Sequence, residues 1–167
     1  PKTAWPPTSE REAFLDAFRQ GGEAAREEKK SLLGFCVLGG IFSEGIDLKG
    51  EALIGAAVVG TGLPQICNER EILRQYYEKK EMDGFAYAYR YPGMNKVLQA
   101  AGRVIRTDRD AGVILLLDER FREPDYRRMF PMEWEDIRFC RLPEAGTVLK
   151  DFWNTRKSIP ETASQPD

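Results

Sequence analysis

Short, continuously apolar runs that are separated by helical segments constrain the fold of this chain most. The three runs are LLGFCVL from Leu32 to Leu38, then Leu53 to Val59, and then Val113 to Leu117. A strand that is covered on both faces of a sheet has a continuous apolar run. Strands that alternate with helices form a parallel sheet. The sequence therefore predicts an α/β fold, a parallel sheet flanked by helices.

The remaining expected elements follow from helix periodicity and from glycine and proline breaks. They are a first helix that buries Phe14, Leu15 and Phe18 and ends at Gly21-Gly22, a helix over Ile66 to Lys80, a third that begins after the Pro92-Gly93 break, a short strand near Ile137 to Arg141, and a helix from about Ala145 to Arg156. With 167 residues and 42% hydrophobic content, we expect one domain over residues 1–157 and a disordered tail over residues 158–167.

Composition excludes several classes of function. The formal charge of -2 comes from 25 basic and 27 acidic side chains, so a nucleic-acid surface can only be local. The absence of histidine excludes Ser-His and Cys-His catalytic pairs and imidazole metal sites within this chain.

Cysteine usage and hydropathy predict the compartment. Cys36, Cys67 and Cys140 form no CxxC pair, which argues for a reducing compartment and for buried thiols rather than disulfides or a metal site. No apolar run approaches the roughly 20 residues that cross a bilayer, and the start of the sequence lacks the pattern of a signal peptide. We expect a cytoplasmic protein without a membrane partner.

A glycine-rich segment, GGIFSEGIDLKG, follows the first apolar run. Ligands of open parallel sheets bind beyond the carboxyl ends of the strands, where this segment would lie. Gly39, Gly40 and Gly45 would let backbone amides approach an anion, Ser43 adds a hydroxyl, and Asp47 suits a ribose hydroxyl or a water. A glycine-rich turn whose acids merely cap the next helix fits the spacing equally well.

A second motif, QAAGRVIR, spans residues 99–106. On a helix, Gln99, Gly102, Arg103 and Arg106 would share one polar, cationic face. These arginines could form weak surface ion pairs with nearby aspartates. Alternatively they reach the terminal phosphate of a nucleoside triphosphate, where a planar bidentate donor neutralises developing charge.

Two other stretches favour structural roles. VILLLDER over residues 113–120 resembles a strand whose aspartate holds magnesium, but the sequence contains no G-x-x-x-x-G-K-[ST] loop, so we interpret Asp118 as structural. The aromatic residues of FAYAYRYPG could stack on unpaired bases, although such a cluster is more often core or half-buried. For TGLPQ, residues 61–65, the sequence does not decide between a ligand loop and an ordinary turn.

The order of GGIFSEGID, VVGTGLPQ, a tyrosine-rich helix and QAAGRVIRTDRDAGVILLLDERF resembles the second motor domain of DNA helicases of the DinG and XPD type. The resemblance covers about residues 32 to 123 directly. It implies a RecA-like α/β domain that is incomplete at its N-terminus, and a helicase that uses ATP to move 5′ to 3′ along single-stranded DNA.

The resemblance also implies roles for individual residues. Arg103 and Arg106 match arginines that approach the γ-phosphate, Gln99 orders that interface, and Gly102 permits close approach. Gly45 and Asp47 match positions of the family that face the nucleotide. Ser43 and Gly40 match positions of the family that face DNA.

What the sequence lacks defines the expected partners. It has no phosphate loop and none of the four iron-sulfur cysteines of the family. We therefore expect ATP and Mg²⁺ to bind only in a complete protein with an N-terminal motor domain, which could also hold an iron-sulfur cluster, and we expect this chain alone to be inactive. The alternative is a non-catalytic α/β module that binds a nucleotide or a protein.

Overall fold

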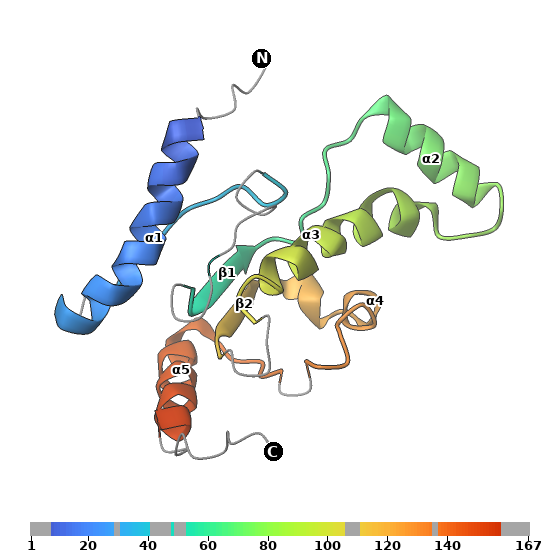
Figure 1. Cartoon of the computed structure of the whole chain (residues 1–167). Helices are drawn as coiled ribbons and strands as arrows, with labels where there is room; N and C mark the ends of the chain where they lie inside the picture. The colour runs from blue at the N-terminus through green and yellow to red at the C-terminus, as the bar shows by residue number, and fades with distance from the viewer. Residues whose placement is uncertain are drawn as a thin grey trace, which may run out of the picture. The chain divides into compact units, whose positions relative to one another are not determined.

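The computed structural model describes residues 8–28, 31–40, 48, 53–105, 111–134 and 137–157. The chain divides into two compact units, Pro1–Phe130 and Pro131–Asp167. Unit 1 contains α1 (Thr8–Glu28), β1 (Gly55–Val59), α2 (Asn68–Glu78), the π-helical turn η2 (Ala86–Arg90), α3 (Tyr91–Ala101), β2 (Val113–Leu117), the 3₁₀ turn η3 (Glu119–Arg122) and α4 (Pro124–Arg127), and unit 2 contains α5 (Leu142–Lys157) (Figure 1). The single domain over residues 1–157 stays a prediction, and residues 158–167 lie outside the described part.

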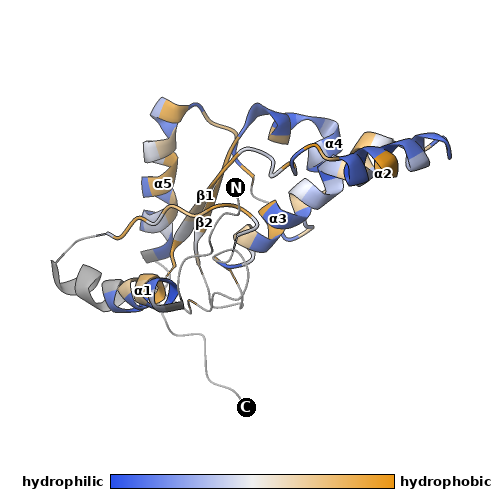
Figure 2. Cartoon of the chain, turned by 90° about the horizontal axis from the view of Figure 1, so that it is seen from above, coloured by the Kyte–Doolittle hydropathy of each residue, from blue (hydrophilic) through white to orange (hydrophobic). Residues whose placement is uncertain are grey.

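The two strands form a parallel pair in register from Gly55 opposite Val113 to Val59 opposite Leu117. The helices α2 and α3 lie between them in the chain, as a parallel pair requires a crossover. Both strands are apolar along their length (Figure 2). The predicted parallel α/β arrangement is therefore confirmed for the second and third apolar runs.

The first apolar run was wrongly predicted to be a buried strand. Residues 31–37 belong to no strand, and Leu33, Phe35 and Val37 are 75%, 88% and 79% exposed. A Cβ on Gly34 would lie 2.7 Å from the Phe14 ring, so the segment packs on α1 through side chains instead of through ladder hydrogen bonds. Apolar composition alone does not provide a neighbouring strand.

Helix α1 continues through the predicted stop at Gly21-Gly22 and ends at Glu28. Each glycine costs a helix about 1 kcal/mol relative to alanine, but the following AAREE segment consists of strong helix formers. The burial prediction is closer to the structure. Leu15 is buried with Leu48, and Phe14, Phe18 and Leu53 pack against this pair.

The main core lies between β1, α3 and the segment after β2. Its buried members are Val58, Met94, Val97, Phe121 and Tyr126. They come from four separate elements, so burial of this cluster joins α3 to β1 and to the η3–α4 segment. Burying a side chain of this size contributes about 1.5–3 kcal/mol.

Pro92 and Gly93 do not break the chain into two helices, contrary to prediction. They lie in the first turn of α3, where the missing proline N–H is tolerated. Gly93 serves a close backbone approach: a Cβ on it would lie 2.7 Å from the Thr61 carbonyl oxygen, and a Cβ on Gly62 would lie 2.7 Å from the Gly93 carbonyl oxygen. This mutual contact seats α3 against the end of β1.

The end of the chain differs from the prediction as well. Residues 137–141 are irregular instead of forming a short strand. Helix α5 begins at Leu142, three residues earlier than expected. Glu144 accepts a hydrogen bond from the Arg141 backbone N–H at 2.9 Å, and this cap favours the earlier start. No helix in the described ranges has the length and apolar character needed to span a membrane.

The contact between Gly62 and Gly93 generates a stability prediction. We expect Gly62→Ala to lower the free energy of unfolding by about 2–4 kcal/mol, because a Cβ there combines backbone strain at a φ of 66° with a steric clash.

Gly60→Ala is the matched control. Gly60 has a φ of 85°, and apart from its two chain neighbours no atom of the described residues lies within 4 Å of its Cβ position, so backbone strain alone, about 1 kcal/mol, should remain. Urea unfolding of both variants measures the difference. Equal losses would contradict the steric role of the contact.

Candidate functional site

The carboxyl end of β1 lies beside the start of the glycine-rich loop. A Cβ on Gly62 would come within 3.0 Å of the Leu38 side chain. Gly39 has a φ of 78°, and a Cβ on it would lie 2.9 Å from Cδ of Lys96 on α3. Gly39, the first residue of the glycine-rich segment, therefore lies beside α3, and Leu38 lies beside the segment that follows β1, at the carboxyl edge of a parallel sheet, where ligands of such sheets bind.

Gly40 is the one residue of the predicted DNA side that the structure describes. It is partly buried, and its backbone N–H donates to the Val37 carbonyl oxygen at 2.9 Å. Its amide therefore closes a turn. Ser43, Gly45 and Asp47 lie outside the described residues, so their predicted contacts remain untested.

The helix that carries the QAAGRVIR motif ends earlier in the motif than predicted. Helix α3 ends at Ala101, Gly102 is its C-cap, and the Arg103 N–H donates to the Ala100 carbonyl oxygen at 3.2 Å in the turn that follows. Gln99 is exposed on the last turn, and Arg103 is half-buried. The expectation that the helix continues through Arg103 is therefore wrong, because the chain after Ala101 tightens into the turn hydrogen bonds from Arg103 to Ala100 and from Val104 to Ala101. Arg106 lies outside the described part.

Two residues at this edge were missed by sequence reasoning. Lys96 packs over Gly39, and its position three residues before Gln99 places both on one side of α3. Thr61 is 1% exposed, and its hydroxyl has no hydrogen-bond partner among the residues that the structure describes. The helical spacing could have identified Lys96, whereas nothing in TGLPQ predicts the burial of Thr61.

Asp118 has a structural role, as predicted. Its Oδ1 accepts hydrogen bonds from the Arg120 backbone N–H and Nε, both at 2.9 Å, and its Oδ2 accepts one from Nη2 at 2.7 Å. The Arg120 side chain is thus the main reason that the pKa of Asp118 lies below its ordinary value. Oδ1 therefore caps the start of η3, and both carboxylate oxygens pair with the Arg120 side chain.

The tyrosine-rich segment is built into the hairpin of α2 and η2. Tyr89 is 4% exposed, and its hydroxyl donates to Glu71, which raises the pKa of Tyr89. Tyr87 stacks on Tyr77 with ring centroids 4.0 Å apart. These contacts favour the structural interpretation for Tyr87 and Tyr89, whereas Phe85 and Tyr91 are each 40% exposed.

The thiols are free, as the sequence predicts, but they are not buried. Cys36, Cys67 and Cys140 are all exposed. Cys36 and Cys67 lie in irregular segments, and an apolar neighbourhood in sequence does not ensure burial there. A reducing, cytoplasmic location stays a prediction.

Comparison with protein families agrees with this arrangement. The family described as the helicase C-terminal domain matches residues 2–137. The chain belongs to this family. Its glycine-rich loop and α3 both lie within the matched residues.

Several relatives are helicases by name. The chain is 33% identical over 124 residues to the ATP-dependent DNA helicase chl-1 of Caenorhabditis elegans, with 72% of the chain and 15% of that protein covered. It is 30% identical over 169 residues to a regulator of telomere elongation helicase 1 homolog of Drosophila persimilis, with 94% and 16% covered. A probable ATP-dependent helicase of Methanocaldococcus jannaschii is 30% identical over 121 residues, with 64% and 19% covered. The chain thus spans less than a fifth of the length of each.

The lowered pKa of Asp118 predicts an acid-sensitive contribution to stability. The ionised carboxylate stabilises the folded state fully above the ordinary aspartate pKa of about 3.9. The contribution is lost as the pH falls from there through the lower folded-state pKa. We expect Asp118→Asn to lower the free energy of unfolding by about 1–2 kcal/mol at pH 7, and by progressively less as the pH falls below about 4.

Urea unfolding at a series of pH values measures this difference. Asp16→Asn is the control, because Asp16 pairs with Arg19 on the surface of α1, where both side chains are 53% exposed. A difference between Asp118→Asn and the parent protein that does not change with pH would be evidence against the role of the ionised carboxylate.

Proposed function

We propose that this chain is the second motor domain of an ATP-dependent DNA helicase that moves 5′ to 3′ on single-stranded DNA. ATP binds between the chain and an N-terminal motor domain of the same polypeptide, and closure of that cleft advances the DNA. Membership of the helicase C-terminal domain family supports the proposal. Its main structural support is the approach of Gly39 to Lys96, which joins the glycine-rich loop to the helix that carries Gln99.

In this proposal two arginines act on the transferred phosphoryl group. The guanidinium groups of Arg103 and Arg106 neutralise the charge that develops on the γ-phosphate, with planar donors that match its oxygens. Gln99 orders the interface. Gly102 leaves room for the phosphate, which is compatible with its exposure at the end of α3.

The glycine-rich loop serves nucleotide and DNA on its two sides. Gly45 and Asp47 face the nucleotide, with Asp47 directed to a ribose hydroxyl. Ser43 and Gly40 face the DNA backbone. Because the Gly40 amide already donates to Val37, Gly40 contributes by lacking a side chain rather than by donating a hydrogen bond.

Magnesium belongs to the other motor domain in this proposal. Asp118 is the acid that follows an apolar strand, as in magnesium sites of nucleotide hydrolases, but Arg120 engages both of its oxygens. Mg²⁺ would therefore be held with the triphosphate by residues of the N-terminal motor domain, as would an iron-sulfur cluster where the complete protein has one.

The arginine role predicts a selective loss of turnover. In the complete protein, we expect Arg106→Ala to lower DNA-stimulated ATP hydrolysis by about a thousandfold, the effect of an arginine finger, while the affinity for single-stranded DNA changes less than about threefold. Steady-state hydrolysis and fluorescence anisotropy measure the two quantities. Arg19→Ala, an exposed arginine on α1, is the control. Unchanged turnover in Arg106→Ala would refute the finger role.

The isolated chain distinguishes a motor half from a free-standing binding module. We expect the purified 167-residue chain to hydrolyse no ATP and to bind it only weakly, with a dissociation constant of about 1 mM or above, because the phosphate cradle is lacking. Calorimetric titration with ATP measures this. Micromolar binding without hydrolysis would instead support a non-catalytic nucleotide-binding module.

A further inference from the structure

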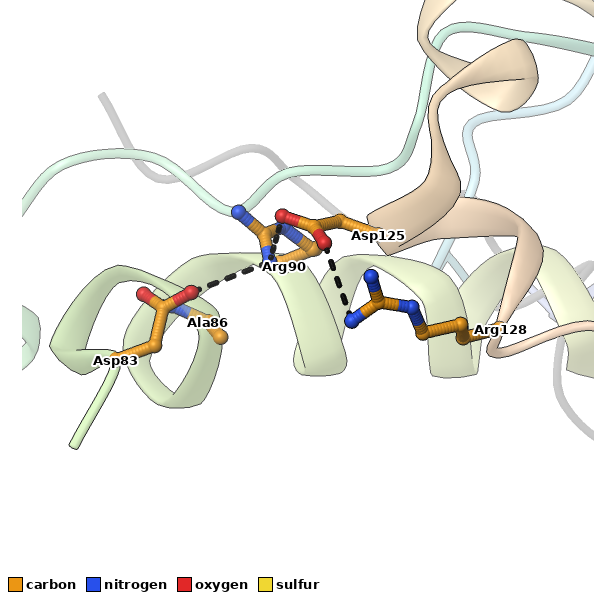
Figure 3. A network of polar contacts seen from close by, with 5 residues as sticks. All are labelled: Asp83, Ala86, Arg90, Asp125 and Arg128. Atoms are coloured by element: carbon orange, nitrogen blue, oxygen red, sulfur yellow. Dashed lines mark hydrogen bonds and ion pairs between the residues drawn. The ribbon is translucent and has the colours of Figure 1, made fainter.

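Arg90 lies at the junction between η2 and α3 and joins three separate segments (Figure 3). Its side chain is 16% exposed, and its Nη1 lies 3.2 Å from Oδ2 of Asp83 and 3.1 Å from Oδ2 of Asp125. Asp83 precedes the helical segment and caps it by accepting the Ala86 N–H at 2.9 Å, and Asp125 belongs to α4. One guanidinium group thus links the base of the hairpin to the segment that follows β2.

Two aromatic rings lie near the same guanidinium group. Its carbon lies 5.7 Å from the centroid of the Phe85 ring and 5.6 Å from that of Tyr126. Tyr126 is 3% exposed and belongs to the main core. A partly desolvated cation near two rings interacts with its carboxylates more strongly than an exposed one, because less water screens it.

The polar network around Arg90 is not complete. Its Nε is buried and has no hydrogen-bond partner in the part of the chain that the structure describes. Both carboxylates of the network are about half exposed, 51% for Asp83 and 46% for Asp125, so water partly screens the two ion pairs and each adds only about 0–1 kcal/mol. Stability alone therefore accounts poorly for an arginine at this position, and a geometric role accounts for it better.

The π-helical turn is stabilised by the neighbouring helix. Such turns are rare and are frequent at functional sites. Arg70 on α2 donates from Nη1 to the Ala88 carbonyl oxygen at 2.7 Å, and Tyr89 donates to Glu71 of the same helix. The hairpin and the first turn of α3 thus form one hydrogen-bonded body, and Arg90 attaches this body to α4.

Gly93 holds the first turn of α3 against the Thr61 and Gly62 backbones, and Arg90 adds a directional polar contact just before that turn. Met94 and Val97 are buried by apolar contact, which is not directional. A helix of 11 residues is about 16 Å long, so a rotation at its start is carried to Gln99 and the Gly102 cap. A rotation of about 10° moves a side chain about 6 Å from the axis by about 1 Å, and a displacement of that size can lower a rate about a hundredfold.

We propose that Arg90 is a positioning residue: its bridge between Asp83 and Asp125 fixes the rotation of α3, and thereby the placement of Gln99 and Arg103 at the γ-phosphate. This inference rests on the proposed function of the chain. Arg90 itself does not touch the nucleotide.

The test compares two arginines that share one partner, in the complete protein. Arg128 also pairs with Asp125, at 3.6 Å, but its side chain is 77% exposed, so Arg128→Gln is the matched control for Arg90→Gln. We expect Arg90→Gln to lower kcat of DNA-stimulated ATP hydrolysis at least tenfold and to change KM for ATP less than threefold. Arg128→Gln should remain within twofold of the parent protein in both.

A double-mutant cycle separates positioning from general loosening. Asp125→Asn should lower kcat in the same direction, and Arg90→Gln combined with Asp125→Asn should lose no more than Arg90→Gln alone, because the two act through one contact. A purely structural role predicts a lower Tm with kcat unchanged well below that Tm. Should Arg90→Gln fail to fold, Asp125→Asn alone tests the same contact with the same expected result.

The outcomes distinguish this inference from the proposed function. If Arg90→Gln and Asp125→Asn turn over ATP within twofold of the parent while Arg106→Ala is inactive, the positioning role is wrong and the motor function stands. If Arg106→Ala is also fully active, the proposed function fails, and the positioning role fails with it.

Discussion

The close approach of two glycine backbones, Gly62 after β1 and Gly93 in α3, is the constraint on which the arrangement of the site depends. Each glycine occupies a place where a Cβ would lie 2.7 Å from a carbonyl oxygen of the other segment. Because the backbones meet directly, α3 lies against the carboxyl end of β1, where Lys96 reaches Gly39. The first residue of the glycine-rich segment, Gly39, is for that reason a neighbour of the helix that begins the second motif.

Two arginines in the described part of the chain hold local structure through carboxylates, one within a turn and one between segments. Arg120 pairs with Asp118, the aspartate whose position after an apolar strand resembles that of a magnesium ligand. Arg90 joins the hairpin of α2 and η2 to α4. In both cases the arginine is partly shielded and bonded to a carboxylate, where its geometry is more directional than that of an apolar contact. The chain as a whole carries almost no net charge, so these effects are local.

Sequence patterns predicted the elements better than they predicted their limits or surroundings. The apolar run 113–117 is a strand as expected, because it finds a parallel neighbour in β1. The apolar run 32–38 is also continuously apolar apart from Gly34, but it pairs with no strand in the described part of the chain and stays irregular. The sequence predicts a helix break at Pro92-Gly93. Gly93 is instead required because its backbone contacts the segment at Gly62, about 30 residues earlier in the chain.

By itself, the sequence determined the alternation of strands and helices, the parallel sheet and the family to which the chain belongs, because hydrophobic periodicity and motif order are local properties. Only the tertiary structure decided that α3 ends before Arg103, that the thiols are exposed, that Thr61 is buried, and that Arg90 bridges two aspartates. Each of these depends on which distant backbone or side chain occupies the adjoining space. That packing results from the whole chain and is encoded in no single stretch of it.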